Sequence, residues 1–589
     1  MKQKSSLKIL MNYLKPYSFK IIISLTCAVI NVVMTLYTPI IIADAIDLIA
    51  YEGFELTRVS AILTRAFIVA LIAGASQLIM NNINNDIAFM SVKDIRNDAF
   101  KKLQKLPLGY IDRNPQGGIV SRIIADVDQL SDGLIMGFTQ LFTGIMTILG
   151  TLIFMVRMNY RIAAVVIVLT PVSLFIAKFV TSKTYTLFSK QSSIRGDQTA
   201  LINEILNNFK VVKAYSHEEA TLEDYEEINS ELKDASLKAI FYSSLTNPAT
   251  RFVNSLIYAA VTLFGALVVI SGGMTIGTLV CFLNYATQYT KPFNEITGVI
   301  TELQNALACA GRIFQLINEE RESSDDDSLK LSDPSGNVFI DKVDFSYLPD
   351  KKLIENLSLS VKSGERIAIV GPTGCGKTTI INLLMRFYDV NEGSISLEGE
   401  FYRDKGTFSS KEDIRNITRK SLRSSYGMVL QETWLRNATV LDNIRIGKPH
   451  ATREEVIAAA KECHAHSFIR RLEKGYDTMI SEDGGQLSQG QKQLLCISRV
   501  MLALPQMLIL DEATSSIDTR TEMRIQDAFL KLMQGRTTFI VAHRLSTIKN
   551  SDLILVMKDG KVIEQGKHLE LLEKKGFYSK LYKAGSGLE

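Results

Sequence analysis

Long uncharged apolar runs interrupt the first half of the sequence and predict membrane-spanning helices. Residues 21–43 contain no charged side chain, and as a helix they would be about 35 Å long, enough to cross a bilayer core. Similar runs follow, and the uncharged stretch 252–290 is long enough for two spans separated at Gly272 and Gly273. We therefore predict six spanning helices, at about 17–46, 60–90, 133–157, 161–182, 250–271 and 275–308.

Basic residues are concentrated in particular loops, and this sets the expected orientation. Lys2, Lys4, Lys8 and Lys15 precede the first apolar run, and lysine and arginine recur between spans two and three and between spans four and five. Such loops stay in the cytoplasm. No small-residue cleavage site follows the first run, so we expect it to remain a span. The prediction is a multi-pass protein of the cell membrane, with its amino terminus and its second half in the cytoplasm.

The second half of the sequence has a different pattern, in which short β-rich runs alternate with helical ones. Residues 319–336 are charged and polar without an apolar period, which is typical of a linker. The later apolar runs 366–370, 507–510 and 538–541 suit buried parallel strands. We predict a multi-domain chain: a six-span α-helical transmembrane domain over 1–318, a linker over 319–336 and an α/β domain over 337–589.

Composition agrees with this division. Hydrophobic residues make up 47% of the 589 positions, and they crowd into the predicted spans. The net charge is only +4, which gives no sign of a nucleic-acid partner. The six cysteines lack the paired spacing of a disulfide framework, and Cys463, His464 and His466 lack a second ligand pair for zinc. We expect contact with the lipid bilayer and none with nucleic acid.

Residues 371–378, GPTGCGKT, match the phosphate-loop pattern G-x-x-x-x-G-K-[ST] between a predicted strand and an apolar helix. Glycines let backbone N–H groups wrap around phosphates, and a helix amino terminus favours negative charge. Lys377 is expected to reach the β- and γ-phosphates, and Thr378 to ligate Mg²⁺. The predicted ATP-binding residues here are Gly371, Pro372, Thr373, Gly374, Cys375, Gly376, Lys377, Thr378 and Thr379.

Two carboxylates, Asp511 and Glu512, come directly after the apolar run 507–510. Asp511 is placed to hold Mg²⁺, directly or through water. Glu512 is placed to act as general base on, or to orient, the water that attacks the γ-phosphate. Many strands end in acidic residues, so this pair indicates nucleotide hydrolysis only in combination with the phosphate loop.

The sequence LSQGQ at 487–491 resembles the signature motif of ABC ATPases, and it precedes Asp511 as in that family. The order of motifs along the chain is similar to that of an ABC exporter half-transporter with the type IV fold. Gln431, Glu512 and His543 would then be the catalytic residues. The resemblance implies these further features: an adenine-stacking Tyr347, a Q-loop Gln431 at Mg²⁺, a D-loop with Ser515 and Asp518, a switch histidine His543 at the γ-phosphate, an X-loop at 481–485, and coupling regions at 117–122 and 209–215.

The resemblance also implies a head-to-tail dimer, in which the phosphate loop of one chain faces the signature motif of the other across ATP. Closure of this dimer would switch the spans between inward-facing and outward-facing states. The usual signature has glycine where this chain has Gln489, and a side chain there crowds a backbone that approaches phosphate. This favours a heterodimer like the bacterial multidrug exporters, in which this chain resembles the consensus-site subunit, with a homodimer as the alternative. The signature residues offered to the partner are Leu487, Ser488, Gln489, Gly490 and Gln491.

The substrate is less constrained by the sequence. No tight cage of like charges lies in the spans, and a wide, weakly polar cavity suits amphipathic small molecules. Multidrug efflux is the first expectation, lipid export the second and peptide export the third, and a non-transporting ATP-binding regulatory subunit is the alternative of another class. For each polar residue near the spans, hydrogen bonding between helices competes with a role on the substrate path. Those residues are Asn247, Asn254, Asn284, Gln288, Lys291, Asn294 and Glu295.

Overall fold

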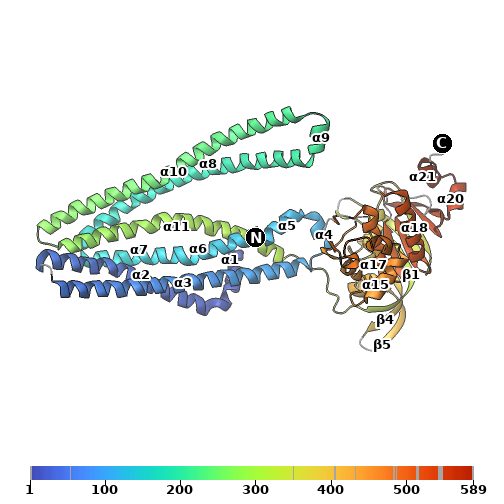
Figure 1. The fold of residues 1–589 in the computed structure, drawn as a ribbon, viewed down its shortest axis with the longest axis horizontal. Helices are drawn as coiled ribbons and strands as arrows, with labels where there is room; N and C mark the ends of the chain where they lie inside the picture. The colour runs from blue at the N-terminus through green and yellow to red at the C-terminus, as the bar shows by residue number, and fades with distance from the viewer. Residues whose placement is uncertain are drawn as a thin grey trace. The chain divides into compact units, whose positions relative to one another are not determined.

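The chain divides into two compact units, which are described separately. The helical unit comprises Met1–Lys105 and Pro115–Glu320, and the sheet unit comprises Leu106–Asn114 and Arg321–Glu589. Figure 1 follows both along the chain. The computed structural model describes residues 3–52, 55–348, 351–403, 406–431, 433–481, 484–485, 487–511, 517–541 and 548–586.

The helical unit is built from long helices joined by short turns. α6, the π-helical turn η3 and α7 follow one another without a break, whereas a single residue separates α7 from α8. The elements are α1 (Gln3–Leu14), η1 (Lys15–Tyr17), α2 (Ser18–Asp47), η2 (Leu48–Glu52), α3 (Leu56–Leu103), α5 (Gln116–Ile123), α6 (Ala125–Met136), η3 (Gly137–Leu141), α7 (Phe142–Met158), α8 (Tyr160–Asn207), α9 (Phe209–Ala214), α10 (Glu218–Ile270) and α11 (Ile276–Ile317).

Among the described residues, the helices long and apolar enough to cross a membrane are Ser6–Tyr51, Leu56–Leu103, Gln116–Met158 and Arg251–Ile270. Three of the predicted spans fall within these segments, and a fourth, at 250–271, matches Arg251–Ile270 to one residue at each end. The other two, at 161–182 and 275–308, fall within α8 and α11, and the apolar helix Tyr160–Pro171 in α8 is shorter than a span. The predicted helical transmembrane domain is therefore confirmed, and the count of six spans stays a prediction.

Polar contacts hold neighbouring helices of this unit together. Ser24 on α2 donates to the side-chain oxygen of Asn84 on α3, and the Asn84 amide donates to Thr139. Both Ser24 and Asn84 are buried, and a buried polar group is costly unless it is paired. Arg312 on α11 makes two hydrogen bonds to the Asp126 carboxylate on α6. These pairs fix the register of α2 on α3 and of α11 on α6.

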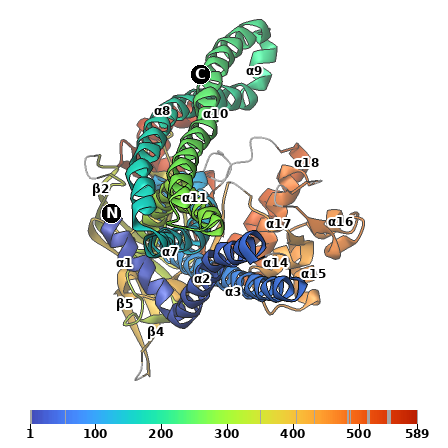
Figure 2. The same cartoon turned by 90° about the vertical axis from the view of Figure 1, so that its left-hand side faces the viewer.

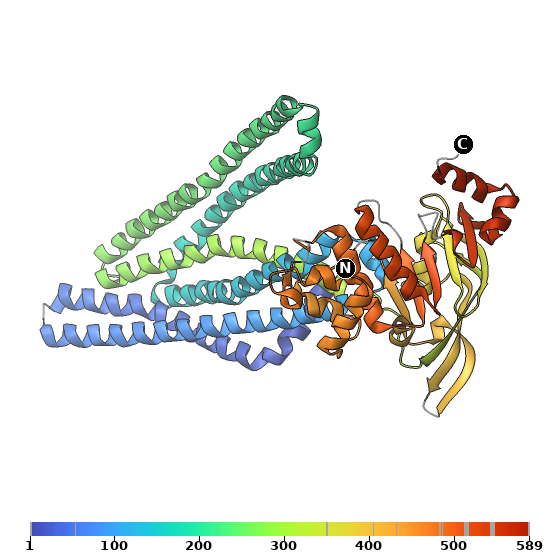
Figure 3. The same cartoon turned by 45° about the vertical axis from the view of Figure 1, so that its right-hand side comes forward.

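Helices α8 and α10 form a long arm that ends in the short helix α9. They lie side by side in Figure 1, Figure 2 and Figure 3. Their 48 and 53 residues would measure about 72 and 80 Å, more than twice the roughly 30 Å thickness of a hydrocarbon core. The arm therefore extends well beyond any membrane that it crosses. Near its tip the apolar side chains of Phe209, Val211 and Tyr215 are exposed.

The sheet unit has two main sheets with helices around them. One sheet has the order β2-β1-β4-β5, with antiparallel pairs, and the other has the order β12-β11-β3-β10-β9-β6. A third, small sheet pairs β7 with β8. The described strands of the whole unit are β1 (Lys330–Phe345), β2 (Ile354–Val361), β3 (Arg366–Val370), β4 (Glu392–Arg403), β5 (Gly406–Asp413), β6 (Tyr426–Val429), β7 (Ala438–Thr439), β8 (Met479–Ile480), β9 (Met507–Asp511), β10 (Thr537–Val541), β11 (Leu553–Lys558) and β12 (Lys561–Gly566).

The helices of the sheet unit include the short α4, which is contributed by the segment between α3 and α5. The others flank the sheets (Figure 1). Together with α4 (Leu108–Arg113), the described helices of this unit are α12 (Lys377–Leu384), η4 (Ile414–Asn416), α13 (Arg419–Ser424), α14 (Val440–Arg445), α15 (Arg453–Glu462), α16 (His466–Ile469), η5 (Gly475–Asp477), α17 (Gln489–Ala503), α18 (Thr519–Met533), α20 (His568–Glu573) and α21 (Phe577–Ser586).

The centre of the six-stranded sheet confirms the predicted strand pattern. β3, β9 and β10 are parallel neighbours, and every residue of β9 and β10 is buried. A strand covered on both faces has no solvent side, so it carries a bare apolar run instead of an alternating one. The predicted α/β fold class is confirmed on this point.

The segment 319–336, predicted as a linker, is only partly free chain. Residues from Lys330 onwards belong to β1, which pairs with β4 from Lys330↔Tyr402 to Asp344↔Glu392. Just before the strand, Arg419 donates to Asp325 Oδ1 over 2.6 Å and to the Ser323 carbonyl over 2.8 Å. Residues 330–334 of the predicted linker pair with residues of β4 that are more than sixty positions away in the sequence. Their side chains are mostly polar and show no apolar period.

Candidate ATP-hydrolysis site

The phosphate loop connects the buried strand β3 to the amino terminus of α12. A Cβ atom on Gly371 would overlap the carbonyl oxygen of Met557, so only glycine fits there. Gly376, the residue before α12, has φ +104°, a conformation that L-residues with a side chain rarely adopt. The loop geometry thus explains both glycines and leaves the first N–H groups of α12 available for an anion.

The side chains of α12 divide between the loop and the protein interior. Lys377 is buried, and its Nζ donates to the carbonyls of Gly371 over 2.8 Å and Pro372 over 3.0 Å, so the amine lies against the loop. Thr378 is exposed, whereas Thr379 and Cys375 are buried. An exposed hydroxyl at the start of the helix fits the predicted role of Thr378 as a metal ligand.

The carboxyl ends of β6, β9 and β10 meet at one edge of the sheet. Asp511, the last residue of β9, pairs with Val541 at the end of β10, and Leu510 pairs with Val429 at the end of β6. Asp511 is buried, and Gln431 is exposed two residues beyond β6. Parallel strands that end together deliver their following residues to the same edge. Glu512, Ser515 and His543 lie outside the described residues, and their roles stay predictions.

Tyr347 is held by aromatic and polar neighbours. Its ring makes edge contacts with Phe345 and Tyr388, with centroids 4.9 Å away in both cases. Its hydroxyl accepts a hydrogen bond from Asn382 Nδ2 over 3.0 Å and donates to Thr379 over 3.4 Å. Both partners are on α12, so the proposed adenine-stacking side chain and the phosphate loop are fixed to the same helix.

Helix α4 contacts this aromatic group directly, which the sequence did not predict. The Tyr388 hydroxyl donates to Asp112, and Arg113 donates to the Tyr347 carbonyl over 3.0 Å. Gly109 lies against the Tyr388 ring, because a Cβ there would be 3.0 Å from it. Burial raises the pKa of Tyr388, and the Asp112 carboxylate raises it further, so the hydroxyl stays a donor.

The coupling role predicted for 117–122 stays a prediction. Those residues form α5 in the helical unit, and the segment that joins the sheet unit is 106–114, just upstream. The local sequence gave no signal for this, since the contact depends on Tyr388, which is more than 270 residues away.

Tyr388→Phe should separate hydrolysis from transport. The substitution keeps the aromatic contacts of Tyr388 but removes its hydrogen bond to Asp112, and a hydrogen bond to a charged group is worth about 1.5–3 kcal/mol. We expect basal ATPase activity within about twofold of wild type, and roughly tenfold less substrate moved per ATP. Uptake and phosphate release measured on the same vesicles give this ratio. An unchanged ratio would show that the bond plays no part in coupling.

The signature motif begins α17 with a capping box. Ser488 Oγ accepts from the Gln491 N–H over 3.3 Å, and Gln491 Oε1 accepts from the Ser488 N–H over 3.0 Å. A Cβ on Gly490 would overlap the Thr521 side chain of α18, so this glycine is required by packing. Gln489 is exposed and donates to Thr433 Oγ1 over 3.3 Å. Leu487 is buried beneath the turn.

Asp518, predicted as part of the D-loop, is the amino-terminal cap of α18. Its carboxylate accepts from the Thr521 N–H over 2.9 Å. That backbone bond lowers the pKa of Asp518, so the cap stays ionised. Capping explains the residue type at 518 without a nucleotide, and the role of Asp518 at a dimer interface stays a prediction.

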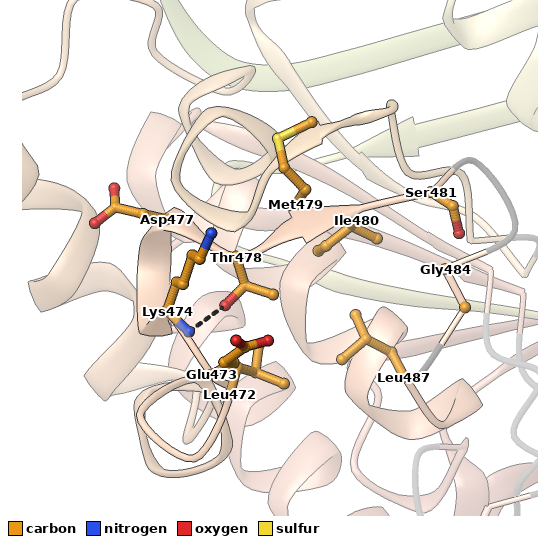
Figure 4. A pocket seen from close by; sticks show the side chains of 11 residues that line it. Leu472, Glu473, Lys474, Asp477, Thr478, Met479, Ile480, Ser481, Gly484 and Leu487 are labelled. Atoms are coloured by element: carbon orange, nitrogen blue, oxygen red, sulfur yellow. Dashed lines mark hydrogen bonds between the residues drawn. The ribbon is translucent and has the colours of Figure 1, made fainter.

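A cavity of about 410 Å³ lies beside the X-loop. The described X-loop residues Ser481 and Gly484 form one side of it, and Leu472, Lys474 and Met479 contribute to the rest (Figure 4). The Lys474 N–H donates to the Thr478 hydroxyl over 3.2 Å and closes the turn at its edge. Met479 is 63% exposed, and the lining also contains the charged residues Glu473 and Asp477, so the cavity presents both apolar and polar side chains.

Helices of membrane length and a phosphate-loop ATPase unit in one chain define a membrane protein that hydrolyses ATP. Residues 21–293 match the family model of the ABC transporter transmembrane region, and residues 354–515 match that of the ABC transporter. The chain belongs to the ABC transporter family, as a half-transporter with the type IV exporter fold, and it couples ATP hydrolysis to transport.

Three proteins illustrate the relationship. A fatty acid ABC transporter ATP-binding/permease protein of Mycobacterium tuberculosis is 38% identical over 92% of this chain and 84% of its own length. An ATP-dependent lipid A-core flippase of Syntrophus aciditrophicus is 32% identical over 98% of this chain and 94% of its own. A solved bacterial Atm1-family ABC exporter with ATP bound is 28% identical, covers 96% of this chain and 98% of its own, and has a TM-score of 0.77.

Proposed function

We propose that the chain is one half of a dimeric exporter that moves amphipathic compounds out across the cell membrane, with its amino terminus and sheet unit in the cytoplasm. The observation that carries this proposal is the arm of α8 and α10. Its length takes α9 far beyond a bilayer, and the exposed apolar side chains of Phe209, Val211 and Tyr215 at that tip suit contact with a protein partner. The X-loop cavity of a second half-transporter, where Met479 is exposed, is the surface we assign to it.

In the proposed dimer, each ATP site combines residues of one chain with the signature motif of its partner. Lys377 and the loop N–H groups bind the phosphates, and Tyr347 stacks on adenine. The oxygens of Thr378, Gln431 and Asp511 suit Mg²⁺, which would neutralise phosphate charge when bound. Glu512 accepts the proton of the attacking water, and His543 contacts the γ-phosphate.

An amphipathic substrate agrees with the substrates that the names of the relatives give. They include the fatty acid and lipid A-core proteins named above and a putative multidrug export ATP-binding/permease protein of Bacillus subtilis, which is 32% identical over 97% of this chain and 98% of its own length. Multidrug efflux is the first candidate activity and lipid export the second. Among the candidate polar residues, Asn284 donates to the Val280 carbonyl of its own helix. The side chains of Asn247, Asn294 and Glu295 lie outside the described residues.

Transport by inside-out vesicles tests the proposal. The chain is purified from its native membrane with whatever chain accompanies it, reconstituted, and supplied with MgATP and either a fluorescent amphipathic cation or a fluorescent fatty acid. We expect uptake that needs hydrolysable ATP, because closure and reopening of the ATP dimer drive the spans. Protein that hydrolyses or binds ATP but moves no amphipathic probe would favour the non-transporting regulatory subunit.

Expression of this chain alone decides between heterodimer and homodimer. Gln489 in the signature favours a heterodimer, in which this chain supplies the intact Lys377 and Asp511 and receives a glycine-containing signature from its partner. We expect the chain expressed alone to hydrolyse ATP weakly and to regain activity with the companion chain. A fully active preparation of this chain alone would establish the homodimer.

A further inference from the structure

The segment that follows Gln431 is fastened along the signature helix. We call residues 433–439 the strap; it starts two residues after Gln431 and leads through β7 into α14. Asn443, fully buried on α14, accepts from the Arg436 N–H over 2.8 Å and donates to the carbonyls of Arg436 and Thr439 over 2.9 and 3.1 Å. These bonds fold the strap back on α14 and give it one conformation.

Arg499 of α17 anchors the strap from the helix side. Its Nη1 donates to the Trp434 carbonyl over 2.7 Å, while Nε and Nη2 donate to the carbonyl and the side-chain oxygen of Asn443 over 2.7 and 2.8 Å. The guanidinium also lies over the Trp434 ring, 5.8 Å from its centroid. Removing this guanidinium would remove all three bonds at once, so strap and helix are expected to move as one body.

Gln489 makes the second connection, at the other end of α17. Gln489 lies ten residues before Arg499, which is about 15 Å along the helix axis. Its Nε2 donates to the Thr433 hydroxyl over 3.3 Å. Thr433 is the first residue of the strap. Glycine, which the usual signature has at this position, has no side chain to make this bond. The departure from LSGGQ therefore adds a contact as well as crowding.

In the proposed dimer the two ends of this connection belong to different ATP sites. Gln431 serves the ATP held by the phosphate loop of its own chain, whereas the signature motif serves the ATP of the partner. We propose that Gln489 is a positioning residue that ties the strap to the signature motif and so links the two ATP sites. This inference rests on the proposed dimeric function.

The test uses the purified transporter with substitutions in this chain only. Gln489→Ala and Thr433→Val each remove the bond, and Thr433→Ser keeps the hydroxyl as a matched control. We expect the first two to lower kcat about two- to tenfold with KM for ATP changed less than twofold, since a net hydrogen bond is worth about 0.5–1.5 kcal/mol. We also expect the Hill coefficient for ATP to fall towards 1, while Thr433→Ser resembles wild type.

The double variant Gln489→Ala with Thr433→Val makes the test specific to the pair. If the side chains act through one bond, the double variant loses no more than either single variant. Additive losses, a wild-type Hill coefficient of about 1, or single variants that match wild type would overturn the inference. Absence of ATP-driven uptake by the wild-type transporter would instead overturn the proposed function, so the two failures are distinguishable. Melting temperatures exclude misfolding, and Thr433→Ser remains informative if Thr433→Val fails to fold.

Discussion

Lys377→Ala is expected to lower ATP hydrolysis by roughly 10²–10³-fold, in line with the loss of a donor that stabilises transition-state charge. The Lys377 amine already lies inside the phosphate loop, bonded to the carbonyls of Gly371 and Pro372. It needs only to turn from these carbonyls to meet phosphate oxygens, so the loop is organised for the charge that develops on them. Alanine leaves the loop glycines intact but removes the cation.

Phosphate release by the reconstituted transporter measures the effect, and a fluorescent ATP analogue measures binding. Lys420→Ala, which removes an exposed lysine from α13 of the same unit, is the matched control for loss of one positive charge. We expect it to match wild type. Comparable activities of the two variants would remove Lys377 from the reaction and would place the ATP site elsewhere.

The strands and the phosphate loop were predictable because their signals are local. The bare apolar runs ending at Val370, Leu510 and Val541 became β3, β9 and β10, since a strand covered on both faces is apolar along its buried length. The glycine pattern of the phosphate loop was equally readable. Backbone conformation at Gly376 and close approach at Gly371 each require glycine wherever the loop occurs.

Contacts between distant segments were not predictable. Tyr388 and Asp112 show nothing in their local sequence, yet they join α4 to the group around Tyr347. Residues 330–336 look like linker because a strand of mostly polar side chains gives no period, and their pairing with β4 is long-range. The side chain of Gln489 was expected only to crowd a phosphate. Its hydrogen bond to Thr433 depends on how the strap packs on α17.

Glu512→Gln is expected to lower hydrolysis by about 10²–10⁴-fold, the usual contribution of a general base, while ATP binding persists. Glu512 directly follows Asp511 in the sequence, and the strand of Asp511 ends beside β10 and beside β6, which itself ends two residues before Gln431. Glutamine keeps the size of the side chain and can still orient water, but it cannot take a proton at neutral pH. The variant should therefore hold ATP in a closed dimer.

Single-turnover hydrolysis and retention of labelled ATP by the closed transporter separate this role from that of Asp511. If Asp511 holds Mg²⁺, Asp511→Asn weakens MgATP binding itself, whereas Glu512→Gln leaves binding intact and stops the cycle after closure. One variant should fail to trap nucleotide and the other should trap it, although both are inactive in steady state. Steady hydrolysis by Glu512→Gln at the wild-type rate would refute its role as the base, and equal trapping by both variants would assign the Mg²⁺ site to other oxygens.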